Sequence, residues 1–342
     1  MRQKSQPVAD LSRARISRVL AVADPETARS VIGVAADLAA RLDARLDVLS
    51  CVEPPRDLDA IARATDLGPD DVIERVREKR RAEMAEALAG SLPDQDARVH
   101  VAIGKSFVEI IGHVLRDKID LVIKAAEPLP RLQNLLFGST DQHLLRKCPC
   151  PVWLRTPDAG RAPRSIIAAV DVDDWDTAEP DTLHDVNRCV VETALRLGAG
   201  QQATVHVLHA WEAIGEGMVW AFASRHDGRA AAAHYVGEIE SARRRSITTL
   251  LKPYEAIAAT LGVRLVPQLV RGPARAVIPD EAKNQSADLV VMGTIARTGL
   301  SGVIIGNTAE DVLNSVACSV VAVKPTSFVS PIAADLAGMR DP

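Results

Sequence analysis

The sequence predicts an α/β protein built from two tandem doubly wound domains, each with a five-stranded parallel sheet. Three observations lead to this fold class. The chain has 342 residues, of which 47% are hydrophobic, so more than one domain with a sizeable core is expected. Short β-branched runs alternate with helical segments, a pattern typical of parallel strands covered on both faces. The two halves of the chain also repeat each other.

The internal repeat fixes the domain organisation. The segment DLVIKA at 120–125 aligns with DLVVMG at 288–293, an offset of 168 residues (288 minus 120). Further identities at the same offset include Gly104 with Gly272, Gly138 with Gly306, and Cys150 with Cys318. Nearer the start of each half, RVLAVAD matches SIIAAVD, and the Pro- and Gly-containing segment RTPDAGRAPR is typical of a linker. The sequence therefore predicts domains over 15–156 and 164–326.

The expected elements follow in the same order in both halves. The first half gives strand RVLAVAD, a helix over 26–42, strand RLDVLSCV, a charged helix over 69–89, strand RVHVAIG, helix SFVEIIGHVLRDK, strand DLVIKA, helix TDQHLLRKC and strand PVWLR. The second half repeats the strands as SIIAAVD, TVHVLHAW, RLVPQLVRG, DLVVMG and SVVAVK. Right-handed crossovers between such strands produce a doubly wound sheet.

Composition excludes several classes of protein. The net charge of −4 and an aromatic content of 3% supply neither a basic face nor a stacking platform, so no nucleic acid partner is expected. Apolar runs reach only about a dozen residues, which is too short for a membrane span of roughly 20. The odd number of cysteines, five, argues against a disulfide framework, and the first residues lack the apolar core of a signal peptide. A cytoplasmic protein is expected.

Candidate binding residues gather at the carboxyl ends of the strands of the second half, where doubly wound sheets bind ligands. A glycine-containing loop leads from the fourth strand to a helix that begins near Gly306, and such helix starts attract anions. The predicted site residues are Asp171, Ala210, Met292, Gly293, Ala296, Gly306, Asn307 and Thr308.

The loop GTIARTGLSGVIIGNTAE resembles that of the universal stress protein family, whose nucleotide-binding members carry G-x2-G-x9-G-[S/T] after the fourth strand. Here the spacing is kept, with Gly293 and Gly306 in place, but Ala296 replaces the middle glycine and Asn307 the Ser/Thr. The resemblance, which is greatest to the tandem-domain E branch, covers Arg15 to Thr326. It implies a role in stress survival, with ATP or AMP as the ligand of members that keep the motif. It also implies that the two domains pair through their last strands, CPVWLR and CSVVAVK, across a pseudo-two-fold axis, with a homodimer as a further level of assembly.

The equivalent loop of the first half departs further from the motif. It reads Ala125, Pro128 and Gly138-Ser139, so only the last glycine and its serine remain. Pro128 also lacks the N–H that a phosphate would need. Nucleotide binding is therefore expected in the second half rather than the first. The alternative is that Gly293 and Gly306 serve only a turn and a close helix–strand contact.

Other motifs have a structural and a functional interpretation. KCPCPVW at 147–153 places two thiols close together, but a second cysteine cluster is missing and packing is favoured. His206 and His209 lie on opposite faces of a strand, so they are a poor metal pair and core histidines are favoured. The acidic run Asp171, Asp173, Asp174 and Asp176 has the ligands for a divalent ion beside a phosphate, but a solvated loop with capping aspartates is favoured. Segment 216–224 is either an exposed apolar patch or the first turn of a helix on the core.

No catalytic set and no metal site emerge from the sequence. The leading hypothesis is a stress-response protein that binds a ligand or a partner and is not an enzyme. One alternative is an ATP- or AMP-binding sensor with slow hydrolysis at the second-half loop. The other is a carrier of apolar ligands, or a scaffold, that uses segment 216–224.

Overall fold

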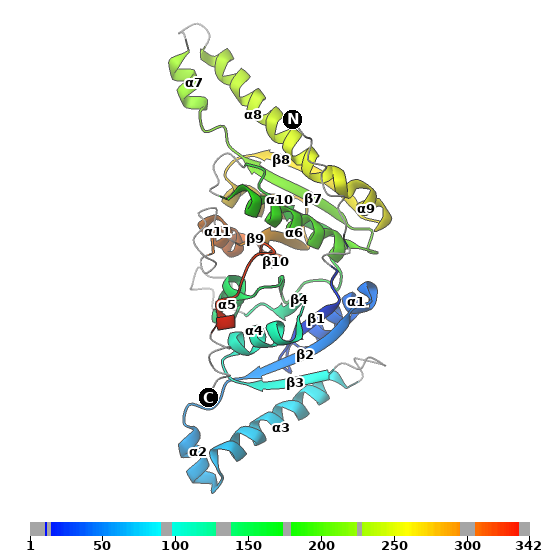
Figure 1. The fold of residues 1–342 in the computed structure, drawn as a ribbon, viewed down its shortest axis with the longest axis vertical. Coiled ribbons are helices and arrows are strands. Elements are labelled where there is room, and N and C mark those ends of the chain that lie inside the picture. The colour runs from blue at the N-terminus through cyan, green and yellow to red at the C-terminus, as the bar shows by residue number, and fades with distance from the viewer. Residues whose placement is uncertain are drawn as a thin grey trace.

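A computed structural model of the chain describes residues 11, 15–89, 98–127, 138–173, 179–223, 228–294 and 305–334. Within them, ten strands form one sheet in the order β3-β2-β1-β4-β5-β10-β9-β6-β7-β8. Figure 1 shows this sheet running along the molecule, with the first half of the chain at one end and the second half at the other. Each half contributes strands in the order predicted for a doubly wound domain.

The first domain contains strands β1 (Arg18–Val22), β2 (Arg45–Val52), β3 (Arg98–Ile103), β4 (Leu121–Ala125) and β5 (Val152–Arg155). Its helices are α1 (Ala28–Leu42), α2 (Leu58–Thr65), α3 (Pro69–Leu88), α4 (Ser106–Asp117) and α5 (Ser139–Lys147). All of its strands pair in parallel. Helix α2 is an element that the sequence analysis did not predict.

The second domain contains strands β6 (Ser165–Ala169), β7 (Thr204–Trp211), β8 (Arg264–Arg271), β9 (Leu289–Gly293) and β10 (Ser319–Val323). Its helices are α6 (Pro180–Gly198), α7 (Glu216–Phe222), α8 (Gly228–Leu251), α9 (Glu255–Thr260), α10 (Ala274–Asn284) and α11 (Asn307–Ser315), with a 3₁₀ turn at Lys252–Tyr254. These strands are parallel as well.

The two domains join through their last strands, as the resemblance to the universal stress protein family implied. β5 and β10 pair antiparallel, with Val320 opposite Leu154 and Ala322 opposite Val152. All residues of both strands are buried. The pairing removes two apolar sheet edges that would otherwise attract other chains.

Helices cover both faces of the shared sheet. One core contains apolar side chains of α1, α3, α6 and α8, and the other contains those of α4, α5, α10 and α11. Each core extends across both domains. Because helices bury both faces of the sheet, the strands are nearly continuous apolar runs. Among the helices of the described residues, none has the combination of length and apolar character that crossing a membrane requires.

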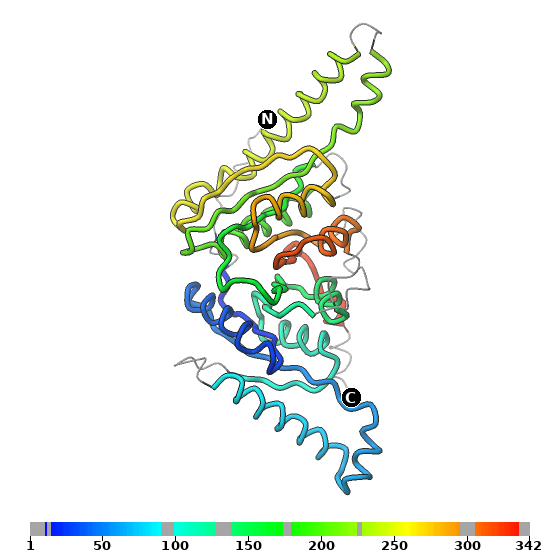
Figure 2. Tube along the Cα trace, turned by 180° about the vertical axis from the view of Figure 1, so that it is seen from behind, coloured from blue at the N-terminus to red at the C-terminus, as the bar shows by residue number. Residues whose placement is uncertain are grey.

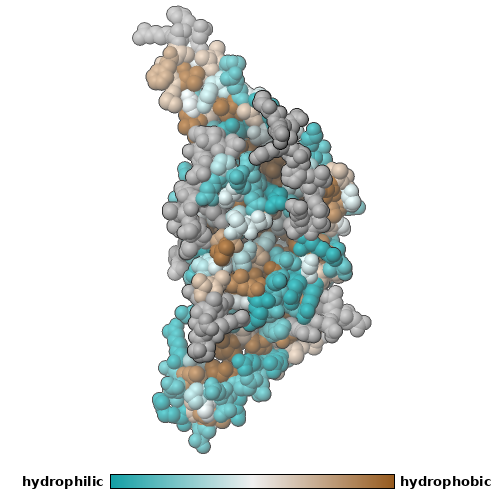
Figure 3. All heavy atoms as spheres, in the orientation of Figure 1, coloured by the Kyte–Doolittle hydropathy of each residue, from teal (hydrophilic) through white to brown (hydrophobic). Residues whose placement is uncertain are grey.

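Two helix pairs project from the ends of the sheet, α2 with α3 and α7 with α8, and both views show them (Figures 1 and 2). The second pair contains the unusual segment 216–224. Its residues Glu216–Phe222 form helix α7, yet Met218, Trp220 and Phe222 are 58%, 63% and 84% exposed. The segment is therefore helical, as one interpretation held, but it is not packed onto the core. Apolar surface is visible at this end in Figure 3.

Candidate functional site

The strand register brings the predicted site residues of the second domain to one edge of the sheet. Ala169 of β6 lies opposite Leu208 of β7 and Met292 of β9. Asp171 lies two residues after Ala169, and Ala210 lies two residues after Leu208. Gly293 is the last residue of β9. This edge lies at the topological switch point, because β6 has β7 on one side and β9 on the other.

An asparagine of α6 holds the backbone of Asp171. Asn187, which is 3% exposed, accepts a hydrogen bond from the Asp171 N–H at 2.9 Å and donates one to its carbonyl oxygen at 2.6 Å. Both peptide groups of Asp171 are thus paired where β6 ends, and its carboxylate accepts the N–H of Asp173 at 3.1 Å. The acidic run therefore begins as an ordered turn. Residues 174–178 lie outside the described residues.

His209 of β7 joins this turn. Its side chain is 1% exposed, its Nδ1 lies 3.3 Å from the carbonyl oxygen of Val170, and its Nε2 lies 3.8 Å from the Asp173 carboxylate. Burial lowers the pKa of His209, which favours the neutral imidazole. Asp171, Asp173 and His209 each offer a ligand atom within 4.8 Å of the others. The sequence analysis treated His209 as a core histidine and did not connect it with the aspartates.

A cation of the protein already lies in this cluster. Arg243 of α8 forms an ion pair with Asp173, and both side chains are largely buried. The guanidinium neutralises one of the two carboxylates, which lessens the attraction of the cluster for a metal ion. We therefore interpret the cluster as a polar network that fixes the end of β6.

The start of α11 has the geometry of an anion-binding helix terminus. Gly306 is the N-cap residue, with an extended backbone and no capping side chain, and Asn307 and Thr308 of the first turn are exposed. These two residues lie inside the helix, so they do not cap it. The N–H of Gly306 donates to the carbonyl oxygen of Thr294 at 3.2 Å, which holds the two ends of the loop together.

Gly293 and Thr294 serve the packing of the domains. A Cβ built on Gly293 would lie 2.5 Å from Cγ1 of Val186 in α6, so glycine is required for this helix–strand contact. Thr294 is 2% exposed, and its hydroxyl donates to the carbonyl oxygen of Leu145 in the first domain at 3.3 Å. The structure therefore explains Gly293 by a close helix–strand contact, whereas the sequence analysis assigned it a turn and assigned such a contact to Gly306. Ala296, like the rest of 295–304, lies outside the described residues.

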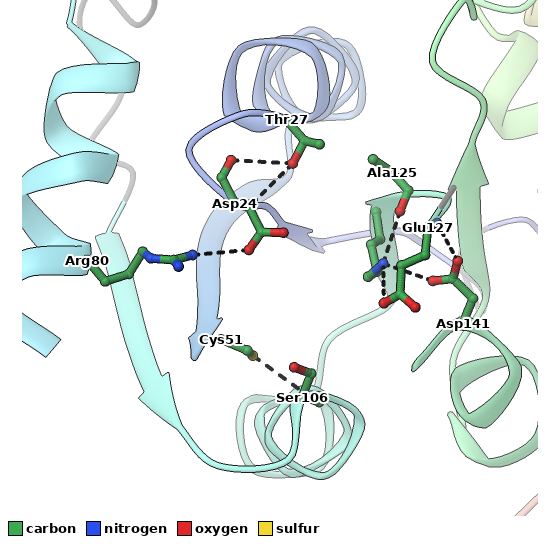
Figure 4. A network of polar contacts seen from close by, with 9 residues as sticks. Asp24, Thr27, Cys51, Arg80, Ser106, Ala125, Glu127 and Asp141 are labelled. Carbon is green, nitrogen blue, oxygen red and sulfur yellow. Dashed lines mark hydrogen bonds and ion pairs between the residues drawn. The ribbon is translucent and has the colours of Figure 1, made fainter. Parts of the chain in front are cut away.

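The first domain fills the equivalent position with its own charges (Figure 4). Lys124 donates to Asp141 at 2.9 Å and to Glu127 at 3.1 Å, and the other oxygen of Asp141 accepts the Glu127 N–H at 2.7 Å. Burial opposes the charge of Lys124, but the two carboxylates outweigh it and raise the pKa of the ammonium. Asp141 is fully buried.

The Glu127 carboxylate also covers the start of α5. A Cβ on Gly138, the N-cap of α5, would collide with that carboxylate. The offset of 168 places Met292 where the first domain has Lys124, and Ala309 where it has Asp141. The second domain therefore cannot build the same ion pair. Pro128 lies outside the described residues.

Both domains pair an aspartate after their first strand with an arginine of a long helix. In the first domain, Arg80 of α3 lies 3.2 Å from Asp24, and Thr27 Oγ1 accepts the Asp24 N–H at 3.1 Å (Figure 4). In the second, Arg243 of α8 pairs with Asp173. The sequence analysis missed both arginines, since each lies more than 50 residues from its partner.

Comparison with known proteins agrees with this architecture. The model of the universal stress protein family matches residues 16–154 and 184–324. These two matches cover most of the chain, and the chain belongs to the universal stress protein family.

Individual relatives point to the tandem branch. Universal stress protein E of Salmonella typhi is 30% identical over 237 residues, which are 68% of this chain and 69% of that protein. Universal stress protein E of Escherichia coli K12 is 29% identical over 238 residues, with the same shares.

Solved structures share the fold over nearly the whole chain. A functionally unknown protein of Pseudomonas aeruginosa PAO1 has a TM-score of 0.64 and 25% identity, covering 96% of this chain and 99% of its own. A putative universal stress protein of P. aeruginosa UCBPP-PA14 has a TM-score of 0.62, 26% identity and the same coverage.

Proposed function

We propose that this chain is a stress-response protein of the cytoplasm that binds an adenine nucleotide, ATP or AMP, in its second domain and acts by binding rather than turnover. One observation carries the proposal. The start of α5 is covered by Glu127, whose carboxylate binds Lys124 and whose N–H donates to Asp141. The second domain has Met292 and Ala309 in place of Lys124 and Asp141. The exposed first turn of α11 leaves its N–H groups for a phosphate.

The remaining contacts would come from the edge of the sheet. Asp171, whose backbone is fixed by Asn187, lies where a ribose hydroxyl would be held, beside Ala210. The first domain would then serve as a structural partner that shares its sheet with the second.

The experiment measures ATP and AMP binding to the full chain by native mass spectrometry of fresh protein and by thermal shift with Mg²⁺. Asn307→Asp puts a negative charge at the first turn of α11, so binding should weaken by about tenfold or more through repulsion of the phosphate. Ser139→Asp makes the equivalent change in α5 and should leave binding unchanged. Absence of both retained nucleotide and a thermal shift would rule the proposal out, as would equal effects of the two variants.

A second candidate function rests on helix α7. Met218, Trp220 and Phe222 are exposed apolar side chains on an arm that is attached by the Glu216–Arg271 ion pair and by the hydrogen bond from Gly215 N–H to Tyr235. Exposed apolar side chains of this kind suit an apolar ligand or a protein partner. Trp220 fluorescence that is indifferent to lipid extract, with unchanged pull-downs for Trp220→Ala, would remove this candidate.

A further inference from the structure

The two cysteines of KCPCPVW lie at the junction of the domains, immediately before β5. Cys148 is fully buried and Cys150 is 8% exposed, and their sulfur atoms are 3.7 Å apart and share a hydrogen bond. The sequence analysis interpreted this segment as packing, because the first domain offers no second cluster of ligands. The structure adds a residue from the other domain.

Lys324 follows β10 and reaches the thiol pair. The antiparallel register places Ala322 opposite Val152, and continuing it by two residues on each strand sets Lys324 opposite Cys150. Lys324 is only 6% exposed, and its Nζ has no hydrogen-bond partner among the described residues. Its contact on the other side is the ring of Phe328, with Nζ 5.3 Å from the centroid. A buried ammonium without a hydrogen-bond partner is a costly arrangement, and the contact with the Phe328 ring offsets only part of that cost.

The electrostatics of the three groups are coupled. Burial lowers the pKa of Lys324 to about 8, and negative charge on either sulfur opposes that shift. Burial raises the pKa of the Cys148 thiol, but the hydrogen bond from Cys150 and the charge of Lys324 outweigh it, so the pKa is lowered. Cysteines buried among apolar atoms alone are inert, whereas a neighbouring cation favours the reactive thiolate.

The pseudo-two-fold axis supplies an internal comparison. The same register places Cys318 opposite Thr156, whose hydroxyl lies 3.4 Å from that of Ser319. Here the lysine is replaced by threonine, and the second thiol is replaced by Val316 at the position equivalent to Cys148. Burial raises the pKa of Cys318 to about 11, which keeps it a thiol. Only one of the two equivalent positions thus has the parts of a reactive pair.

We propose that Cys148, Cys150 and Lys324 form a thiol oxidation site at the domain junction, where hydrogen peroxide converts the two thiols to a disulfide. A thiolate attacks the peroxide, forming an S–O bond as the O–O bond breaks, and the leaving hydroxide takes a proton from the Lys324 ammonium to become water. The second thiol attacks the sulfenic acid, which forms the S–S bond, and its proton joins the departing hydroxide to release a second water. Hydrogen peroxide takes up the two electrons, and a dithiol reduces the disulfide back to the two thiols.

The test treats the reduced full chain with hydrogen peroxide, blocks remaining thiols and maps tryptic peptides by mass spectrometry. The peptide spanning 148–155 should become unreactive to the blocking reagent and lighter by two hydrogens, before Cys318 is modified. Cys150→Ser should halt at a sulfenic acid on Cys148 that dimedone traps. Cys318→Ser is the matched control and should oxidise at the wild-type rate.

The role of Lys324 is tested separately. Lys324→Met should slow oxidation about tenfold at neutral pH and move the pH profile of the rate upward, because a thiolate without its cation forms at higher pH. A merely structural lysine would change the melting temperature but leave the pH profile in place. Failure of the disulfide to form, equal reactivity of Cys318, or a stoichiometric metal ion on the thiols of the purified protein would overturn the proposal.

Discussion

Removal of the Asp141 carboxylate should strongly destabilise the first domain. In Asp141→Ala, the Lys124 ammonium loses a partner at 2.9 Å, and the N–H of Glu127 loses its acceptor at 2.7 Å. Both groups stay in a site where Asp141 is fully buried and Lys124 largely so. Breaking one side of a buried pair typically costs about 3–5 kcal/mol.

The lower part of that range applies here. Glu127 remains 3.1 Å from Lys124, but its side chain is 36% exposed, so water screens part of its attraction. We expect a loss of about 3 kcal/mol in the free energy of unfolding. The double variant Lys124→Met with Asp141→Ala copies Met292 and Ala309 of the second domain, and it should recover more than half of that loss, since no unpaired charge stays buried.

The assay is urea unfolding followed by circular dichroism and by fluorescence, with coincidence of the two curves as the test of a single transition. The matched control is Ala309→Asp, which buries a carboxylate without a lysine and should destabilise the second domain. An Asp141→Ala variant within about 0.5 kcal/mol of wild type, or a double variant less stable than the single one, would refute the reasoning.

Three further outcomes are expected. Gly293→Ala should destabilise the second domain by about 1–3 kcal/mol, as the new methyl meets Val186, and Val186→Ala in the same chain should restore part of it in urea unfolding. His113 is 4% exposed and burial lowers its pKa, so the unfolded chain binds more protons and stability should fall as the pH drops below about 6.5. His113→Gln should flatten that slope in a pH series of melting curves. Trp220→Ala should change stability by less than about 0.5 kcal/mol, because the ring is already exposed; a larger loss would show that α7 packs in solution.

The sequence predictions were most accurate for elements whose signals lie close together along the chain. The charged helix expected over 69–89 is α3, Pro69–Leu88, since its N-terminal proline and mixed-charge surface are local signals. Helix α2 was missed because it has only eight residues, of which Ala62 alone is buried, so its pattern is too short to stand out from a loop. Segment 216–224 was ambiguous because its apolar residues are equally typical of a buried turn and of an exposed face.

The residues of the candidate site also fall into those that the sequence predicted and those that it did not. The repeat and the strand ends placed Asp171, Ala210, Met292 and Gly293 at one edge, because side-by-side parallel strands end together. The partners of that edge, Asn187 and Arg243, come from helices, and no sequence spacing relates them to it.

The sequence by itself determined that this chain folds as two similar α/β halves, and its resemblance to a known family implied that they join at their last strands. Hydrophobic periodicity and the repeat can be read from the sequence alone, because neither depends on which side chains come into contact in the fold. Only the tertiary structure decided that Glu127 covers the start of α5 and that Lys324 faces Cys148 and Cys150. Contacts of that kind depend on rotamers, on strand register and on how helices cross the strands. The surroundings of the Glu127 carboxylate and of the two thiols could therefore be described only from the packed structure.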